Sequence, residues 1–535
     1  MFSISTYFSI QYIILLLAAI FFYEILPQRG RRWVLLLFSY LFFYAISGKL
    51  VLFLMASTLS VHHIGLWLAD IQNDCKKELS GIDKKDRDRK KAINAEFTKK
   101  QRRVMTFAVI FHVGMLLVLK YSTFGITNIN HLFKLIHVPV HVHPPRFMIP
   151  IGISFYTLQA VAYLFDVYRE KITADRNLLR ISMFMSFFPQ IMEGPICRYE
   201  DTASSLWEAN RIKYENFILG LQRILFGVMK KLVIADRLNL MLQNIYSGYA
   251  EYDGFAMILA AVFYTLQLYC DFSGTMDVVI GSAQIFGVNL PENFRRPFFS
   301  ATISEFWKRW HVTLGTFFKD YVFFPLSMSK PLKKLTTNAR KKLGNHFGPL
   351  LAGAIALFTV WLFNGLWHGA GWNYIFFGMF HFVLILSGSI FEPLIIKVTQ
   401  KLHIKRSSKP YKCFQIVRTS ILVCIGELFF RAESLGAGLT MFSKMFTNFS
   451  LKTVKDGTIF TYGMDRADFI IIGVGVLLLF TISLLQERGV KIRESIGKRN
   501  IVFQFAVFYL LIMFIVVFGA YGTGYIPVDP MYAEF

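Results

Sequence analysis

The feature that most constrains this chain is the recurrence of apolar stretches about as long as a lipid bilayer is thick. From Phe347 to Phe391 no Asp, Glu, Lys or Arg occurs. A helix crosses the hydrocarbon layer with about 20 mostly apolar residues. Candidate spans lie near 7–26, 33–47, 50–69, 104–120, 147–167, 216–234, 254–270, 347–366, 372–391, 414–430, 468–485 and 501–520. Shorter apolar pieces at 181–192 and 272–288 are expected to be re-entrant or tilted.

This spacing predicts an all-α, polytopic integral membrane protein with roughly 11–14 transmembrane or re-entrant helices. Of the 535 residues 54% are hydrophobic and 17% charged, against about 25% charged in soluble domains. The two-residue alternation of a membrane β-barrel does not occur. We expect one membrane domain over residues 1–535. Its first span is expected to be retained, with the N-terminus outside, because basic residues follow that span and none precedes it.

The basic residues are concentrated in loops. The net charge is +24, and segment 72–103 holds twelve Lys and Arg against six acids. Segments 330–342 and 397–412 hold six basic residues each and no acid. The positive-inside rule places all three loops in the cytoplasm, and loop 121–146, with only Lys134 and Arg146, outside. Anionic lipid headgroups are the expected partners rather than nucleic acid, and an acidic carrier protein is an alternative.

Signatures of bound metals and cofactors are missing from the sequence. The five cysteines are scattered, and no CxxC, HExxH or Walker motif occurs. We therefore expect no disulfide framework, no metal site and no bound cofactor.

Polar residues gather in the segment 269–391, which we predict to hold the functional site, because polar groups inside a bilayer are costly. In "SEFWKRWHVTLGTFFKDYVFFPL" at 304–326, a helix places Glu305 beside Arg309 and Trp307 on the face of His311. Such a helix is too polar to meet lipid all round. It either anchors the protein at the membrane interface or lines a cavity.

The stretch "NGLWHGAG" is predicted to be a turn on the non-cytoplasmic side, because basic cytoplasmic loops lie before and after its hairpin. Gly365, Gly369 and Gly371 allow the backbone to break there. Irregular backbone at membrane depth is tolerated beside a cavity or protein. His368 is therefore expected in a cavity wall, although a neutral histidine bonded once to a neighbouring helix is an equal alternative.

Two histidines in polar, tryptophan-flanked settings indicate proton transfer. Imidazole is suited to general base catalysis near neutral pH. Because no serine or cysteine lies in a nucleophile elbow, His368 and His311 suggest direct transfer to an incoming hydroxyl. A proton relay in a transporter or flippase is the alternative from another class.

At these residues the chain resembles a known family. "FWKRWHVTLGTFFKDYVF" and "GLWHGAGW" are similar to motifs of the membrane-bound O-acyltransferase (MBOAT) family, in its bacterial branch of alginate O-acetylases and D-alanyl transfer proteins of teichoic acid synthesis. "PIGISFYTLQAVAYLFDVYR", "EGPICRYED", "DFSGTMDVVIGSAQIFGVNLPENFRRPF" and "ELFFRAESL" resemble the same branch, and "PMYAEF" at 530–535 stands where that family has an aromatic tail.

The resemblance implies catalytic roles for His368 and His311 and helices that surround a central tunnel. The supporting candidates for substrate binding are Asp271, Asn293, Arg309 and Trp367. It implies an acyl group, by preference acetyl, carried by a cytoplasmic thioester of coenzyme A or of a carrier protein. The acceptor would be a hydroxyl of a cell-surface polysaccharide or of an exported partner. D-Alanyl transfer to teichoic acid is the alternative within this family, and the expected location is the bacterial cytoplasmic membrane.

Overall fold

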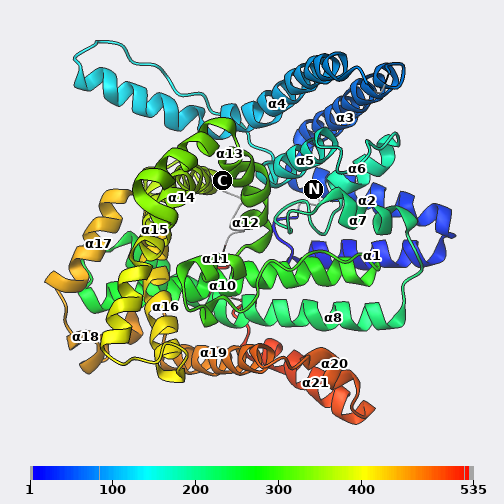
Figure 1. Ribbon diagram of the computed structural model, residues 1–535. Coiled ribbons are helices and arrows are strands. Elements are labelled where there is room, and N and C mark those ends of the chain that lie inside the picture. The colour runs from blue at the N-terminus through cyan, green and yellow to red at the C-terminus, as the bar shows by residue number, and fades with distance from the viewer. Residues whose placement is uncertain (1–3, 84, 523, 529–535) are drawn as a thin grey trace. The chain divides into compact units, whose positions relative to one another are not determined.

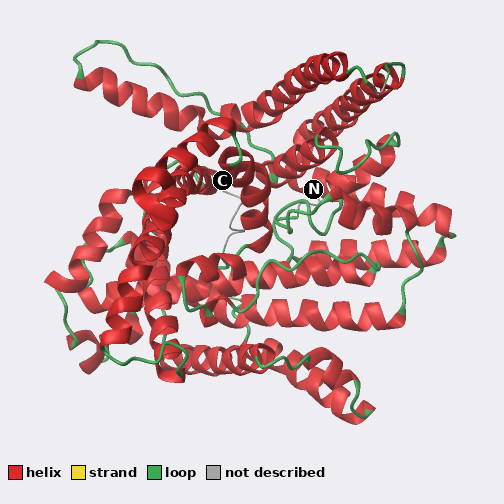
Figure 2. Ribbon diagram, viewed as in Figure 1, coloured by secondary structure: helices red, strands yellow, loops and turns green. Residues whose placement is uncertain are grey.

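Helices form the regular structure of this protein. The computed structural model describes residues 4–83, 85–522 and 524–528. Within these ranges the only β-pairing is one isolated antiparallel bridge between Phe294 and Trp310, and Figure 2 shows helices joined by loops. The tail at 530–535 lies outside the described residues. The expected all-α class is thus confirmed.

The chain divides into two compact units. Among the described residues, the first unit comprises those up to Gly220 together with Ser282–Pro291. Its helices, labelled in Figure 1, are α1 (Ile10–Ile25), α2 (Gln28–Ser47), the 3₁₀ turn η1 (Gly48–Leu50), α3 (Val51–Ser80), α4 (Arg87–Leu135), α5 (Ile153–Tyr168), α6 (Leu178–Ser186) and α7 (Tyr199–Glu208).

In the first unit, α3, α4 and α5 pack against one another. The α4 helix begins where the side chain of Asp86 accepts a hydrogen bond from the backbone N–H of Arg89, as an N-cap residue does. It then continues without a break to Leu135. The predicted outer loop 121–146 is therefore wrong in its first half, because residues 121–135 extend the helix. Their backbone groups gain intrahelical partners by doing so.

The second unit comprises Leu221–Gly281 and the described residues from Glu292 onward. Its helices are the π-helical η2 (Lys230–Ala235), α9 (Asp236–Ser247), η3 (Pro297–Phe299), α11 (Ile303–Arg309), α12 (Val312–Phe318), η4 (Lys319–Phe323), α13 (Phe324–Ser327), α14 (Lys330–His368), α15 (Trp372–Lys401), α16 (Lys409–Arg431), α17 (Leu435–Thr447), α18 (Lys452–Lys455), η5 (Thr458–Thr461), α19 (Arg466–Glu487), α20 (Ile492–Gly497) and α21 (Ile501–Phe518).

Two further helices, α8 (Tyr214–Met229) and α10 (Gly254–Ile285), have residues in both units. The α10 helix is continuous over 32 residues. The prediction that 272–288 is a piece separate from the span 254–270 is therefore wrong, because its residues up to Ile285 belong to the same helix. Asp271 and the polar residues after it continue one long helix, because their side chains find partners inside the protein.

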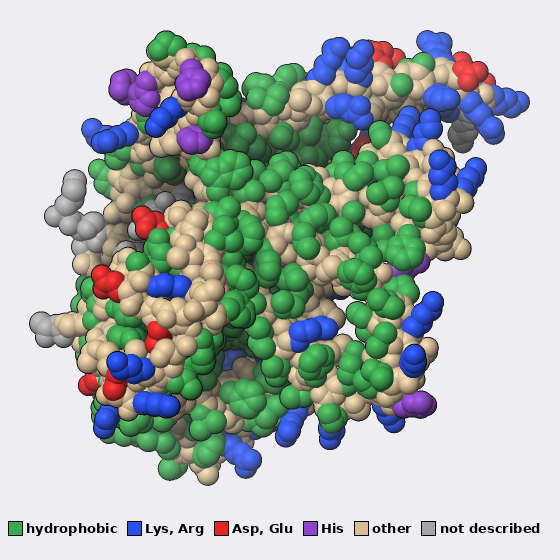
Figure 3. Space-filling model, turned by 90° about the vertical axis from the view of Figure 1, so that its left-hand side faces the viewer, with side chains coloured by type: hydrophobic (Ala, Val, Ile, Leu, Met, Phe, Trp, Pro, Cys, Tyr) green, Lys and Arg blue, Asp and Glu red, His purple; other side chains and the backbone are tan. Residues whose placement is uncertain are grey.

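The described residues contain eight segments that are long and apolar enough to cross a membrane: Gln28–Ser80, Arg87–Leu135, Gly254–Ile285, Lys330–His368, Trp372–Lys401, Lys409–Arg431, Arg466–Glu487 and Ile501–Phe518. The first of these contains both α2 and α3. Predicted spans 147–167 and 216–234 correspond to the shorter α5 and α8, of 16 residues each. Apolar side chains cover much of the surface drawn in Figure 3, as expected of helices that meet lipid.

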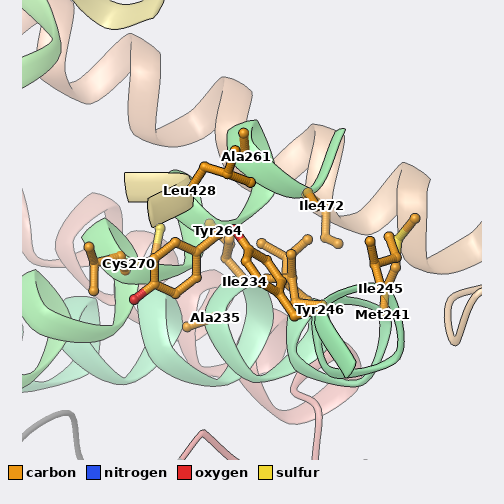
Figure 4. Packing of buried hydrophobic residues seen from close by; sticks show 14 of the residues in the cluster. Ile234, Ala235, Met241, Ile245, Tyr246, Ala261, Tyr264, Cys270, Leu428 and Ile472 are labelled. Carbon is orange, nitrogen blue, oxygen red and sulfur yellow. The ribbon is translucent and has the colours of Figure 1, made fainter. Parts of the chain in front are cut away.

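The core of the second unit lies among η2, α9, α10, α16 and α19. Tyr246 and Tyr264 meet at its centre with ring centroids 5.8 Å apart, and Leu428 and Ile472 pack around them (Figure 4). A polar side chain of α10 is satisfied nearby, where Lys230 Nζ donates to the Ser273 hydroxyl at 2.8 Å. The second unit thus combines an apolar core with buried polar pairs, and it carries both predicted histidines.

Candidate active site

The α14–α15 hairpin positions His368. Its two helices touch where only glycine fits, because a Cβ at Gly365 would lie 2.5 Å from the carbonyl oxygen of Tyr374, and one at Gly378 would collide with the carbonyl oxygen of Trp361. The α14 helix ends at His368, and Gly369–Gly371 lead into α15. The predicted turn at "NGLWHGAG" is confirmed in its last three residues, 369–371, while residues 364–368 complete the helix.

His368 is buried, with 6% of its surface exposed, and aromatic rings surround it. Its ring centroid lies 4.9 Å from that of Trp367, 5.1 Å from Phe430 and 6.0 Å from Phe377, all edge to face. Asn373 supports this wall, since its side-chain amide donates to the carbonyl oxygen of Ala432 at 3.1 Å. The ring orientation of His368 is therefore set by packing against α15 and α16.

A break between two short helices positions His311. The α11 helix ends at Arg309, and His311 adopts a left-handed backbone conformation, φ 45° and ψ 51°, before α12 begins. The predicted shared face of Trp307 and His311 is therefore wrong, because the helix does not continue between them. The predicted Glu305–Arg309 pair is confirmed at 2.7 Å.

Asn293 holds His311 in this conformation. The backbone N–H of Val312 donates to the carbonyl oxygen of Asn293 at 3.0 Å. The side-chain oxygen of Asn293 faces three donors: the backbone N–H of Thr313 at 3.0 Å, the Thr313 hydroxyl at 3.0 Å and Nδ1 of His311 at 3.2 Å. A left-handed conformation costs a non-glycine residue about 1–2 kcal/mol, and this network offsets that cost.

The network also decides which nitrogen of His311 carries the proton. A backbone N–H only donates, so the Asn293 atom facing Thr313 is the amide oxygen, which only accepts. Nδ1 of His311 therefore carries a proton, and Nε2 presents a lone pair that has no hydrogen-bond partner among the described residues. Burial lowers the pKa of His311 to about 3, so the ring is neutral near pH 7.

The structure brings four of the six predicted site residues together. The Trp367 ring lies between the two histidines, 5.5 Å from His311 and 4.9 Å from His368 by centroid. Asn293 contacts His311 as described above. These four residues come from three segments of the second unit.

The other two candidates, Asp271 and Arg309, form ion pairs. Lys231 Nζ lies 2.7 Å from Asp271 and 3.1 Å from Asp236, and all three are buried. Arg309 pairs with Glu487 at 3.0 Å as well as with Glu305. Their roles in substrate binding stay predictions, and their contacts are those of structural ion pairs.

Sequence reasoning missed four residues of this neighbourhood. Thr313 carried no signal because its bonds to Asn293 arise only in the fold, and Phe377 and Phe430 were hidden among the 56 phenylalanines of the chain. Glu427 did carry a signal, since it is the one acid in the predicted span 414–430. An ionisable residue in such a span is a functional candidate by default.

The arrangement can perform proton transfer without a metal. Two buried imidazoles flank one indole, and one of them presents an unshared lone pair. Within the described ranges no group of three or more His, Cys, Asp or Glu is placed to hold a metal ion. A paired-imidazole site inside a helical membrane protein can deprotonate or orient a hydroxyl group.

Fold and site together define a polytopic membrane protein with a buried pair of histidines. Residues 168–339 match the model of the MBOAT, membrane-bound O-acyltransferase family. This chain belongs to the membrane-bound O-acyltransferase family.

Named relatives extend the match. The chain is 31% identical over 350 residues to a protein of Azotobacter vinelandii named probable alginate O-acetylase, covering 65% of this chain and 64% of the relative. It is 29% identical to the peptidoglycan O-acetyltransferase of Helicobacter pylori over 64% of each chain. It is 28% identical to the teichoic acid D-alanyltransferase of Bacillus subtilis, over 57% of this chain and 74% of the relative. The chain thus spans less than two thirds of the length of the first two relatives.

Proposed function

We propose that this protein is an O-acyltransferase that moves an acyl group, by preference acetyl, from a thioester to a hydroxyl of a cell-surface polysaccharide or of an exported partner. The observation that carries the proposal is the pair of buried histidines around Trp367 in a chain of the membrane-bound O-acyltransferase family. The names of the relatives, two acetyl-transferring and one D-alanyl-transferring, support acyl transfer to a surface polymer.

His368 is the proposed general base. It takes the proton of the acceptor hydroxyl as that oxygen attacks the thioester carbonyl carbon. The new C–O bond forms, the C–S bond breaks, and the proton passes from His368 to the leaving thiolate. General base catalysis contributes typically about 10² to 10⁴ in rate, and holding donor and acceptor in line contributes more.

His311 is proposed to orient the acceptor. Its Nε2 lone pair can accept a hydrogen bond from a hydroxyl group. The Nδ1–H group already donates to the side-chain oxygen of Asn293, so the neutral ring has no second N–H to donate to an oxyanion. This tautomer favours a contact with the attacking hydroxyl over a contact with the carbonyl oxygen of the thioester.

The proposed donor is an acyl thioester of coenzyme A or of a carrier protein, reached from the cytoplasm of a bacterial cell. Basic residues of 72–103, 330–342 and 397–412 offer a docking surface for such acidic molecules, and many of them are exposed. The similarity to the teichoic acid D-alanyltransferase of Bacillus subtilis favours D-alanyl transfer as the second candidate.

The decisive variant is His368→Gln, compared with His346→Gln on the same helix. His346 is exposed, and its Nε2 hydrogen-bonds to the carbonyl oxygen of Ser389 at 3.1 Å. We expect His368→Gln to lower polymer acylation by about 10²-fold or more with normal protein level in the membrane, and His346→Gln to acylate normally. Normal acylation by His368→Gln would refute the proposed catalytic role. Equal loss of activity and protein level would assign His368 a structural role instead.

A further inference from the structure

One buried carboxyl group of the second unit is not used by this mechanism. Glu427 lies on α16 with 1% of its surface exposed. Its Oε2 atom has no hydrogen-bond partner among the described residues. Leaving a buried polar atom unpaired costs about 1–3 kcal/mol, and more for a charged group, so such an atom in a native protein calls for an explanation.

A second unpartnered polar atom lies in the same neighbourhood. The Tyr246 hydroxyl is buried and has no hydrogen-bond partner in the described part of the chain. Tyr246 and Tyr264 both lie within electrostatic range of Glu427 and Arg431. Arg431 is exposed, and its guanidinium lies 5.7 Å from the centroid of the Tyr246 ring. This polar group therefore consists of the buried carboxyl of Glu427, the buried hydroxyl of Tyr246 and the exposed guanidinium of Arg431.

This polar group adjoins His368. On α16, Phe430 follows Glu427 by three residues and Arg431 by four, so all three occupy one side of the helix. Phe430 contacts His368 at 5.1 Å by ring centroid, and one helical turn advances about 5.4 Å. The Tyr374 ring also contacts Phe430, at 5.2 Å by centroid. Phe430 thus connects the aromatic wall around His368 to the turn of α16 that carries Glu427.

We infer that Glu427 and Tyr246 form an acceptor subsite beside His368, which binds a second hydroxyl of the saccharide whose first hydroxyl is acylated. A carboxyl oxygen accepts from a hydroxyl, and a tyrosine O–H both accepts and donates, so the hydroxyl groups of a sugar suit both unpartnered atoms. This inference rests on the proposed function. It identifies the acceptor as a compound with several hydroxyl groups rather than a simple alcohol.

The subsite places Glu427 in the role of a positioning and specificity-determining residue. It makes no contact with the thioester and exchanges no proton in the reaction. Its effect should fall on the KM of the acceptor and on the preference for polyhydroxy acceptors. The KM of the donor should not change.

The test uses the full-length protein in sealed vesicles with an acyl thioester and two acceptors, a soluble oligosaccharide and a monohydroxy alcohol. The variants are Glu427→Gln and Tyr246→Phe. The matched control is Thr419→Val, since Thr419 lies on the same helix, is 2% exposed and also has an unpartnered hydroxyl, but lies two turns away from Glu427. Thermal stability is measured for each purified variant.

We expect Glu427→Gln to raise the KM of the oligosaccharide about 3- to 10-fold, the change expected for loss of one hydrogen bond between uncharged groups, because the amide offers one acceptor oxygen where the carboxyl has two. Its transfer to the alcohol should stay within about twofold, and its melting temperature should be close to that of the wild type, because one buried polar group replaces another of similar size. Tyr246→Phe should act in the same direction, more weakly, and Thr419→Val should act like the wild type.

Three results would overturn the inference. An unchanged oligosaccharide KM in Glu427→Gln, with active wild type, would refute the subsite and leave the proposed function intact. Equal loss with both acceptors together with a lower melting temperature would show that Glu427 is structural. A wild type that acylates neither acceptor would instead refute the proposed function, and the subsite with it.

Discussion

Replacement of Asn293 by alanine should remove the hydrogen bonds that hold the His311 ring and the backbone beside it in place. The substitution removes the oxygen that accepts from His311 Nδ1 and from the backbone N–H and hydroxyl of Thr313. Asn293 is fully buried, so the His311 and Thr313 N–H groups lose their partner away from water. Each such donor costs about 1–3 kcal/mol, and the free energy of unfolding should fall by about 2–6 kcal/mol.

Activity should fall with stability, because the left-handed backbone of His311 and the proton on its Nδ1 both depend on Asn293. Thr313→Val is the graded control. It removes only the hydroxyl bond and should cost about 0.5–1.5 kcal/mol with most of the activity retained. The measurements are denaturant titration in one detergent and acyl transfer at saturating donor.

A double variant makes the reasoning refutable. If Asn293 acts through His311, Asn293→Ala in a His311→Gln background should lower the transfer rate by less than about twofold further, since residues that act as a unit are not additive. Full additivity of the two rate losses, or an Asn293→Ala protein with wild-type stability, would show that the network does not hold the histidine.

Three further predictions concern topology, sidedness and packing. In a background without the native cysteines, an impermeant thiol reagent should label His141→Cys but not Ser80→Cys in intact cells; the reverse pattern would invert the charge-based topology. Oriented vesicles should accept the acyl donor only at the face that bears the basic segments 72–103, 330–342 and 397–412, and should release acylated product at the other face. Product that forms only when donor and acceptor share a compartment would contradict transfer across the membrane. Gly378→Ala should destabilise the α14–α15 hairpin by about 1–3 kcal/mol, while Gly388→Ala, with no atom within 4 Å of the added Cβ, should be neutral or stabilising by about 0.5–1 kcal/mol; equal melting temperatures would refute the close-packing argument.

Local patterns were read correctly where the cause was local. The Glu305–Arg309 pair follows from helical spacing alone, and the glycine-rich turn after His368 follows from backbone freedom. Errors arose where a distant segment changed the local preference. The helix through Trp310 and His311 breaks because Asn293–Arg295 pairs with this segment, as in the hydrogen bond from the Arg295 N–H to the Arg309 carbonyl oxygen at 2.8 Å.

Candidate residues follow the same division. Asp271 and Arg309 are rare polar residues in an apolar chain, and rarity alone could not separate a substrate ligand from a partner in a buried ion pair. Glu427 was detectable as an acid inside a predicted span. Its significance depends on Tyr246, which lies on α9, and on the contact of Phe430 with His368, which lies on α14. Only contacts between helices distinguish these cases.

The sequence by itself determined the helical membrane class and singled out His311 and His368 as candidate site residues. It could do so because bilayer thickness, charge bias and residue chemistry act on each segment independently. The tertiary structure alone decided the tautomer of His311, the position of Trp367 between the histidines, and that Glu427 Oε2 has no hydrogen-bond partner among the described residues. The physical reason is that hydrogen bonds and close packing between helices depend on atoms far apart in the chain. In the low-dielectric interior of the second unit, those atoms decide whether a polar group is satisfied within the protein or left to a substrate.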